Sequence, residues 1–117
     1  PDLILRNGGS DPHFADELIE LGITVKGFHK IGSIVRETAE EVCGGKIVDM
    51  VGSGYNADVL PCSWLALVCG ISGVDIDLTD PVQLPDWLDS RLGMEEVKRI
   101  VKEVKANLAP YWDCFGK

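Results

Sequence analysis

The sequence predicts an α/β fold with parallel strands, because two short apolar runs alternate with two helical patterns along residues 1–73. Each apolar run ends in a glycine-rich loop. The order strand, helix, strand, helix is typical of a parallel sheet with right-handed crossovers, whose ligand site lies beyond the carboxyl ends of the strands. We therefore expect Asp11, in the first loop, and Tyr55, in the second, to point into one crevice.

The first strand is expected at residues 3–6, and the loop after it begins at Asn7. From Thr24 the apolar residues recur with helical period, so that one side of the helix faces a core. Thr24 is a suitable N-cap, and Gly44 with Gly45 supplies the C-terminal stop. The apolar stripe of this helix consists of Phe28, Ile31, Ile34 or Val35, Ala39 and Val42.

A second buried strand is expected at residues 46–51, followed by a mostly apolar helix over 57–70. Residues 74–78 alternate like a further strand, and the proline-containing segment after them reads as a surface loop. Residues 94–108 are a clear amphipathic helix that Pro110 stops. Two or three strands are too few for a doubly wound sheet, so residues 1–117 are expected to be one segment of a larger domain.

The bulk composition excludes several classes of protein. A formal net charge of −8 argues against nucleic acid as a partner. No run approaches the roughly 18 apolar residues that a membrane span needs. The chain starts at Pro1 rather than Met, and Pro1-Asp2-Leu3-Ile4-Leu5 goes straight into an apolar run, which we interpret as a cut end. Its cysteines form no CxxC pair and no zinc-finger spacing, so we interpret them as structural thiols of a cytoplasmic protein; they are Cys43, Cys62, Cys69 and Cys114.

Two side chains are candidates for chemistry. Asp11 lies just past a strand in a Gly/Pro loop, where a carboxylate serves as a metal ligand or general base, or more commonly as a turn or capping residue. Tyr55 follows Gly54, where a turn exposes its hydroxyl as a donor to a developing oxyanion. The alternative for Tyr55 is a loop tyrosine packed on its neighbours.

Both loops carry motifs with a family resemblance. The first runs through Pro1-Asp2-Leu3-Ile4 and Gly9-Ser10-Asp11-Pro12-His13, and continues through Asp16, Leu18, Leu21, Ile23-Thr24 and Gly27-Phe28. The second is Gly52-Ser53-Gly54-Tyr55-Asn56 with Leu60 and Trp64 in the following helix. Together they resemble the late metal-ligand segment and the G-G-G-Y-N segment of the histone deacetylase family, with Ser53 at one of the glycines.

The resemblance implies the C-terminal portion of an arginase/deacetylase-like fold, which is a three-layer αβα arrangement. It implies that Asp11 is one of three protein ligands of Zn²⁺, that Tyr55 polarises the substrate carbonyl, and that Gly54 contacts the substrate. The implied reaction is deacetylation of an acetylated amine, such as acetyl-lysine or an acetylpolyamine. The family's other ligands and its histidine pair precede this segment, so the isolated chain is expected to be inactive.

His13 is then expected either at the rim of the site or behind its ligand residues, and His29 on the surface of its helix. Two further interpretations compete with the deacetylase. Residues 52–57 fit GxGxxA between a strand and a helix, with Asp75 or Asp77 a little over twenty residues on, which is a dinucleotide-binding fingerprint. The third is a non-catalytic α/β interaction domain. An exposed sheet edge also favours a homodimer.

Overall fold

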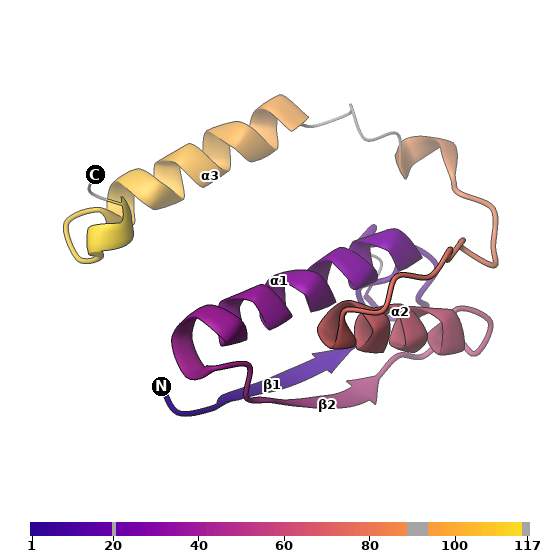
Figure 1. The fold of residues 1–117 in the computed structure, drawn as a ribbon. Helices are drawn as coiled ribbons and strands as arrows, with labels where there is room; N and C mark the ends of the chain where they lie inside the picture. The colour runs from indigo at the N-terminus through magenta and orange to yellow at the C-terminus, as the bar shows by residue number, and fades with distance from the viewer. Residues whose placement is uncertain (20, 89–93, 116–117) are drawn as a thin grey trace. The chain divides into compact units, whose positions relative to one another are not determined.

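The structure of the chain, a computed structural model, describes residues 1–19, 21–88 and 94–115. The chain divides into two compact units, Pro1–Leu84 and Pro85–Lys117. The elements in chain order are β1 (Ile4–Gly9), α1 (Val25–Cys43), β2 (Ile47–Ser53), α2 (Leu60–Ser72), the 3-10 turn η1 (Asp86–Leu88), α3 (Met94–Leu108) and the 3-10 turn η2 (Asp113–Phe115) (Figure 1).

β1 and β2 pair in parallel, which confirms the predicted sheet. The register joins Ile4 to Ile47 and continues to Gly8 opposite Val51, with an irregularity between Gly8 and Gly9. Each strand continues past its predicted end into the glycine-rich segment, because the small residues there still pair across the sheet. The two loops therefore leave the sheet at neighbouring points of the same edge.

α1 begins and ends where its capping residues predict. The Thr24 hydroxyl accepts a hydrogen bond from the Gly27 amide at 3.1 Å, and Gly44 adopts the left-handed conformation with φ 64°. Of the predicted apolar stripe, Phe28 and Ala39 are buried, while Ile34 and Val42 are exposed. Val35 is partly buried, and is the inward member of the Ile34/Val35 pair.

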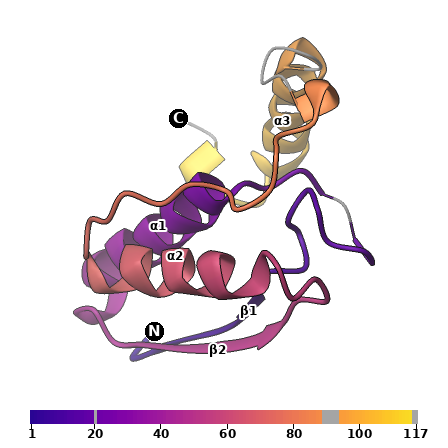
Figure 2. The ribbon, with the colours of Figure 1, turned by 90° about the vertical axis from the view of Figure 1, so that its right-hand side faces the viewer.

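α1 and α2 lie side by side over the same face of the sheet (Figure 2). They approach so closely that a Cβ on Gly32 would lie 2.5 Å from the Leu67 carbonyl oxygen, and one on Gly70 would lie 2.9 Å from the Ser33 nitrogen. Only glycine allows this backbone contact. Next to it is the core cluster of Val25, Phe28, Ala66 and Leu67.

The prediction of two buried strands is wrong, because the apolar side chains on one face of the strands are only partly buried and those on the other face are exposed. Exposure alternates along β2 and along the first four residues of β1, and the face away from the helices carries exposed apolar side chains from both strands and from the residue before β1. The described residues of the first unit thus form a sheet and one helical layer, consistent with part of a three-layer fold. The exposed residues are Leu3, Leu5, Val48 and Met50.

Two predicted boundaries differ from the structure. α2 begins at Leu60 rather than at residue 57, because the amides of Val59 and Leu60 first bond to the Asn56 carbonyl in a turn. Residues 74–78 form no strand, since their backbone runs beside α1, where it meets a helix instead of a strand edge. There the His29 ring bonds to the Val74 carbonyl oxygen, and Leu78 packs on the core cluster.

The second unit contains α3 with the predicted bounds. Ion pairs along this helix join Lys98 to Glu95 at 2.8 Å, and Arg99 to Glu96 and Glu103 at 2.5 and 2.6 Å. The hydrogen bond from Arg99 lowers the pKa of Glu96 below its ordinary value. Within the described part of the chain, no helix has the length and apolar character required to cross a membrane.

Candidate functional site

The two loops are joined to each other where they leave the sheet. The carbonyl oxygen of Ser53, the last residue of β2, accepts a hydrogen bond from the Ser10 amide at 2.7 Å and from the Ser10 hydroxyl at 3.2 Å. The same oxygen accepts from the Trp64 indole at 3.1 Å, which connects the loop to α2. Ser10 is buried, so the start of the first loop is fixed against the end of β2.

Asp11 lies two residues beyond the end of β1 and is partly buried. Its Oδ1 accepts a hydrogen bond from the Ser53 hydroxyl at 2.5 Å. A hydroxyl bond to an ionised carboxylate is short and strong, and it orients the group. Ser53, at a position where the family motif has glycine, therefore holds the candidate metal ligand from the opposite loop.

Tyr55 shows a different arrangement of backbone and side chain. Its amide donates to Asp16 Oδ2 at 2.8 Å, whereas the residue as a whole is 57% exposed. Before it, Gly54 has φ 145°, and a Cβ there would collide with the Ser10 hydroxyl oxygen. The backbone that presents Tyr55 is thus fixed, and the phenol extends from it toward solvent.

Asp16 and Asn56 complete the connection between the loops. Asp16 is buried, and its Oδ1 accepts from the Leu18 amide at 2.9 Å. The Asn56 side-chain amide donates to the Ala15 carbonyl oxygen at 2.7 Å. Sequence reasoning gave neither residue a role, although both belong to the motifs that carry the family resemblance.

His13 is fully buried, so of its two expected positions the one at the rim of the site is wrong. Its Nδ1 accepts from the Ala15 amide at 3.0 Å, which leaves the proton of the neutral ring on Nε2, 3.0 Å from Asp80 Oδ1. The same Asp80 oxygen accepts from the Val25 amide at 2.9 Å. His13 therefore ties the first loop to the start of α1.

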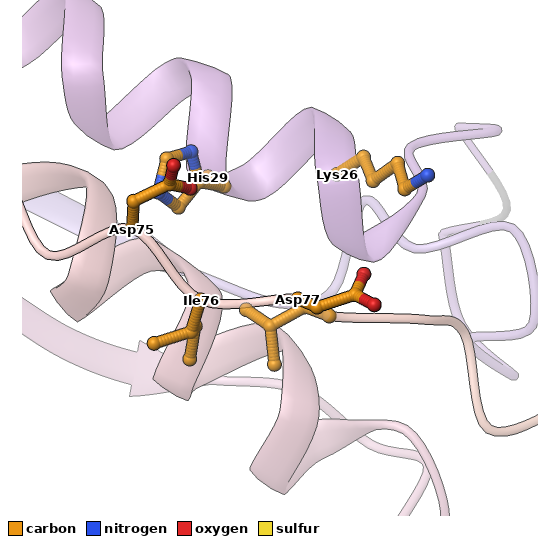
Figure 3. A pocket seen from close by; sticks show the side chains of 6 residues that line it. Lys26, His29, Asp75, Ile76 and Asp77 are labelled. Carbon is orange, nitrogen blue, oxygen red and sulfur yellow. The ribbon is translucent and has the colours of Figure 1, made fainter.

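A cavity of about 440 Å³ lies away from these loops, between the first half of α1 and the segment after α2 (Figure 3). Its lining includes Lys26 and His29 from α1, with Asp75 and Asp77 opposite them. Neither Asp11, Gly54 nor Tyr55 lines it. The structure connects the predicted site residues only through the hydrogen bonds between their two loops. The crevice into which Asp11 and Tyr55 are expected to point stays a prediction.

A metal ion at this site would need more ligands than the described residues supply. In residues 1–19, 21–88 and 94–115, no three His, Cys, Asp or Glu side chains are grouped so that they could hold one. Asp11 offers a carboxylate at the carboxyl edge of the sheet, and Ser53 holds it in place. A hard oxygen ligand of this kind suits Zn²⁺ as one member of a larger ligand set.

The fold and its joined loops define an α/β protein with a candidate site at the carboxyl edge of a parallel sheet. The chain belongs to the histone deacetylase family: the family model described as histone deacetylase domain matches residues 1–71. The match includes both loops. α2 begins only at Leu60, after a turn, so the second loop does not open directly into a helix as a dinucleotide site requires. We therefore discard that alternative.

Several relatives have printed names from this family. The chain is 28% identical over 98% of its length to a probable deacetylase of Archaeoglobus fulgidus, and 30% identical over 75% to the acetoin utilization protein AcuC of Bacillus subtilis. It is 40% identical over 54% of its length to the chloroplastic histone deacetylase 10 of Oryza sativa subsp. japonica. These matches cover 33%, 22% and 14% of the relatives, so the chain spans a third or less of their length.

Proposed function

We propose that this chain is the C-terminal segment of a zinc-dependent deacetylase, in which Asp11 binds the metal and Tyr55 acts on the substrate carbonyl. One observation carries the proposal: the Ser53 hydroxyl bonds to Asp11 at 2.5 Å, two residues before Tyr55. The loop of the candidate oxyanion donor thus holds the candidate metal ligand. Family membership supports the assignment of a deacetylase.

The chemistry is divided between the metal and the chain. A bound zinc ion supplies Lewis acidity, since it polarises an acyl carbonyl and lowers the pKa of its water. The Asp11 carboxylate provides one ligand, and the remaining ligands come from outside residues 1–117. The Tyr55 hydroxyl donates a hydrogen bond to the oxyanion that forms when the amide carbonyl is attacked. Gly54 contacts the substrate beside it.

The proposed substrate is an acetylated amine, such as acetyl-lysine or an acetylpolyamine. An acidic chain, with a net charge of −8, favours the approach of cationic substrates. We also propose a cytoplasmic location, because all four cysteines are free thiols.

The test compares the complete protein with the isolated chain. We expect the complete protein to hydrolyse an acetyl-lysine or acetylpolyamine reporter, to lose this activity with a chelator and to regain it with Zn²⁺. The isolated chain should show no turnover and bind zinc weakly, because it offers one ligand instead of three. If the complete protein shows no chelator-sensitive turnover, the proposal of a zinc-dependent deacetylase is refuted. If the isolated chain is active, the proposal that the other zinc ligands come from outside it is refuted.

The exposed apolar face of the sheet supports the proposal that this chain is a segment of a larger domain. Leu3, Leu5, Val48 and Met50 form an exposed apolar group, and unpaired strand edges favour association. We expect the isolated chain to dimerise or associate further. Light scattering at high concentration measures this, and a strictly monomeric chain would favour a self-sufficient domain.

A further inference from the structure

The buried carboxylate of Asp16 joins the two loops of the candidate site. Only 1% of the residue is exposed, and both of its oxygens accept backbone amide protons. Oδ1 accepts from Leu18 at 2.9 Å, which closes a turn within the first loop. Oδ2 accepts from the Tyr55 amide at 2.8 Å, across 39 residues of sequence.

The bond to the Tyr55 amide acts on the backbone, not on the phenol. Tyr55 is 57% exposed, so packing contributes little to the position of its side chain. On one side of it, Gly54 is constrained by contact with Ser10, and on the other, the Asn56 side chain bonds to the Ala15 carbonyl oxygen at 2.7 Å. Asp16 provides the direct hydrogen bond to Tyr55 itself.

We propose that Asp16 is a positioning residue, which fixes the Tyr55 backbone so that its hydroxyl meets the oxyanion. This inference rests on the proposed function of Tyr55. A buried carboxylate suits the task, because each of its oxygens accepts one amide proton. An asparagine of the same shape keeps one acceptor and turns its NH₂ toward the other backbone amide. A buried polar group left without a partner is costly, so this loop is expected to shift.

The test is Asp16→Asn in the complete zinc-loaded protein. We expect kcat to fall by about 10- to 100-fold, the range for losing a hydrogen bond to a charged group, while KM and zinc content stay near those of the wild type. In a Tyr55→Phe background, Asp16→Asn should lower kcat by less than about 3-fold, since residues that act as a unit are non-additive. If Asp16→Asn lowered kcat by the full 10- to 100-fold in the Tyr55→Phe background as well, the proposal would be overturned. Such a result would show a general structural defect, because the loss would not depend on the Tyr55 hydroxyl.

Two further variants complete the experiment. Glu17→Gln makes the same acid-to-amide change at the neighbouring exposed residue and should leave kcat unchanged. If Asp16→Asn does not fold, Asp16→Glu replaces it, since it keeps the charge and displaces the oxygens by one methylene. An Asp16→Glu protein with wild-type kcat would contradict the positioning role.

Hydrogen exchange separates this inference from the proposed function. The Tyr55 amide hydrogen should exchange faster in Asp16→Asn than in the wild type. Its exchange rate in Glu17→Gln should equal that of the wild type. If the wild-type protein has no deacetylase activity, the proposed function and its catalytic consequence for Asp16 both fail. The exchange rate of the Tyr55 amide in Asp16→Asn then still decides whether Asp16 holds this amide. An exchange rate equal to that of the wild type would overturn the inferred hydrogen bond.

Discussion

The two loops at the carboxyl edge of the sheet are fixed by different means. In the loop after β1, side chains form the connections: Asp16 accepts two amides, and the buried His13 ring bonds to Asp80. At the end of β2 and in the loop after it, backbone groups act beside the side chains of Ser53 and Asn56, since the Ser53 carbonyl accepts from Ser10 and from Trp64 and the Tyr55 amide donates to Asp16. Substitutions in the first loop are therefore expected to remove hydrogen bonds between the loops. Replacing a glycine in the second loop by another residue is expected to distort its backbone.

Asp11 and Tyr55, the two candidate functional residues, are also held through different groups. The Asp11 carboxylate has a partner in Ser53, whereas the Tyr55 phenol is exposed and only its amide is held. A ligand that must stay in place is oriented by its neighbour, and a donor that acts in the transition state extends from a rigid backbone. The following variants of the complete protein test this difference.

Asp11→Ala should have the largest effect. It removes a ligand, so zinc content and turnover should be lost together, while the fold persists because Asp11 lies in a loop outside the core. Metal analysis and a reporter assay measure both. Asp58→Ala, at an exposed aspartate of the second loop, is the control and should keep zinc and activity. Unchanged zinc in Asp11→Ala would exclude Asp11 as a ligand.

Tyr55→Phe deletes one hydroxyl and leaves the ring. We expect kcat to fall by roughly 10²–10³, because the hydroxyl acts mainly in the transition state, with little change in KM, zinc content or stability. Tyr111→Phe makes the same change in the second unit and should leave kcat unaltered. Near-normal turnover by Tyr55→Phe would remove the hydroxyl from the mechanism.

Gly54→Ala tests how the second loop is fixed. The φ of 145° disfavours a side chain, and the new Cβ would collide with the Ser10 hydroxyl, so the free energy of unfolding should fall by about 1–3 kcal/mol. Gly52→Ala is the matched control, because a Cβ there meets no atom within 4 Å. Chemical denaturation compares the two, and equal stabilities would contradict the close contact.

Ser53→Gly should have the smallest effect. It restores the glycine of the family motif and removes the hydrogen bond to Asp11, so zinc affinity should fall by about 10-fold, as for other partners of metal ligands. Competition with a chelator measures the Kd. Ser53→Thr keeps the hydroxyl and should retain more of the affinity. An unchanged Kd in Ser53→Gly would show that Asp11 needs no orientation by Ser53.

Sequence reasoning succeeded where the signal is local. Thr24 and Gly44 fix the ends of α1, because capping depends on a few adjacent residues, and the amphipathic period fixes α3. It failed at residues 74–78, whose strand-like alternation cannot show whether a neighbouring strand is available. It also left the position of His13 open, since a polar residue gives no local sign that Asp80 lies within bonding distance.

The sequence by itself determined the parallel α/β order, the two loops and the family resemblance, because these depend on periodicity and on motifs along the chain. Only the tertiary structure showed that Ser53 bonds to Asp11 and that Asp16 bonds to the Tyr55 amide. These pairs are 42 and 39 residues apart in sequence, and the parallel register alone brings their loops together. A hydrogen bond depends on distance in space, which spacing along the chain does not fix.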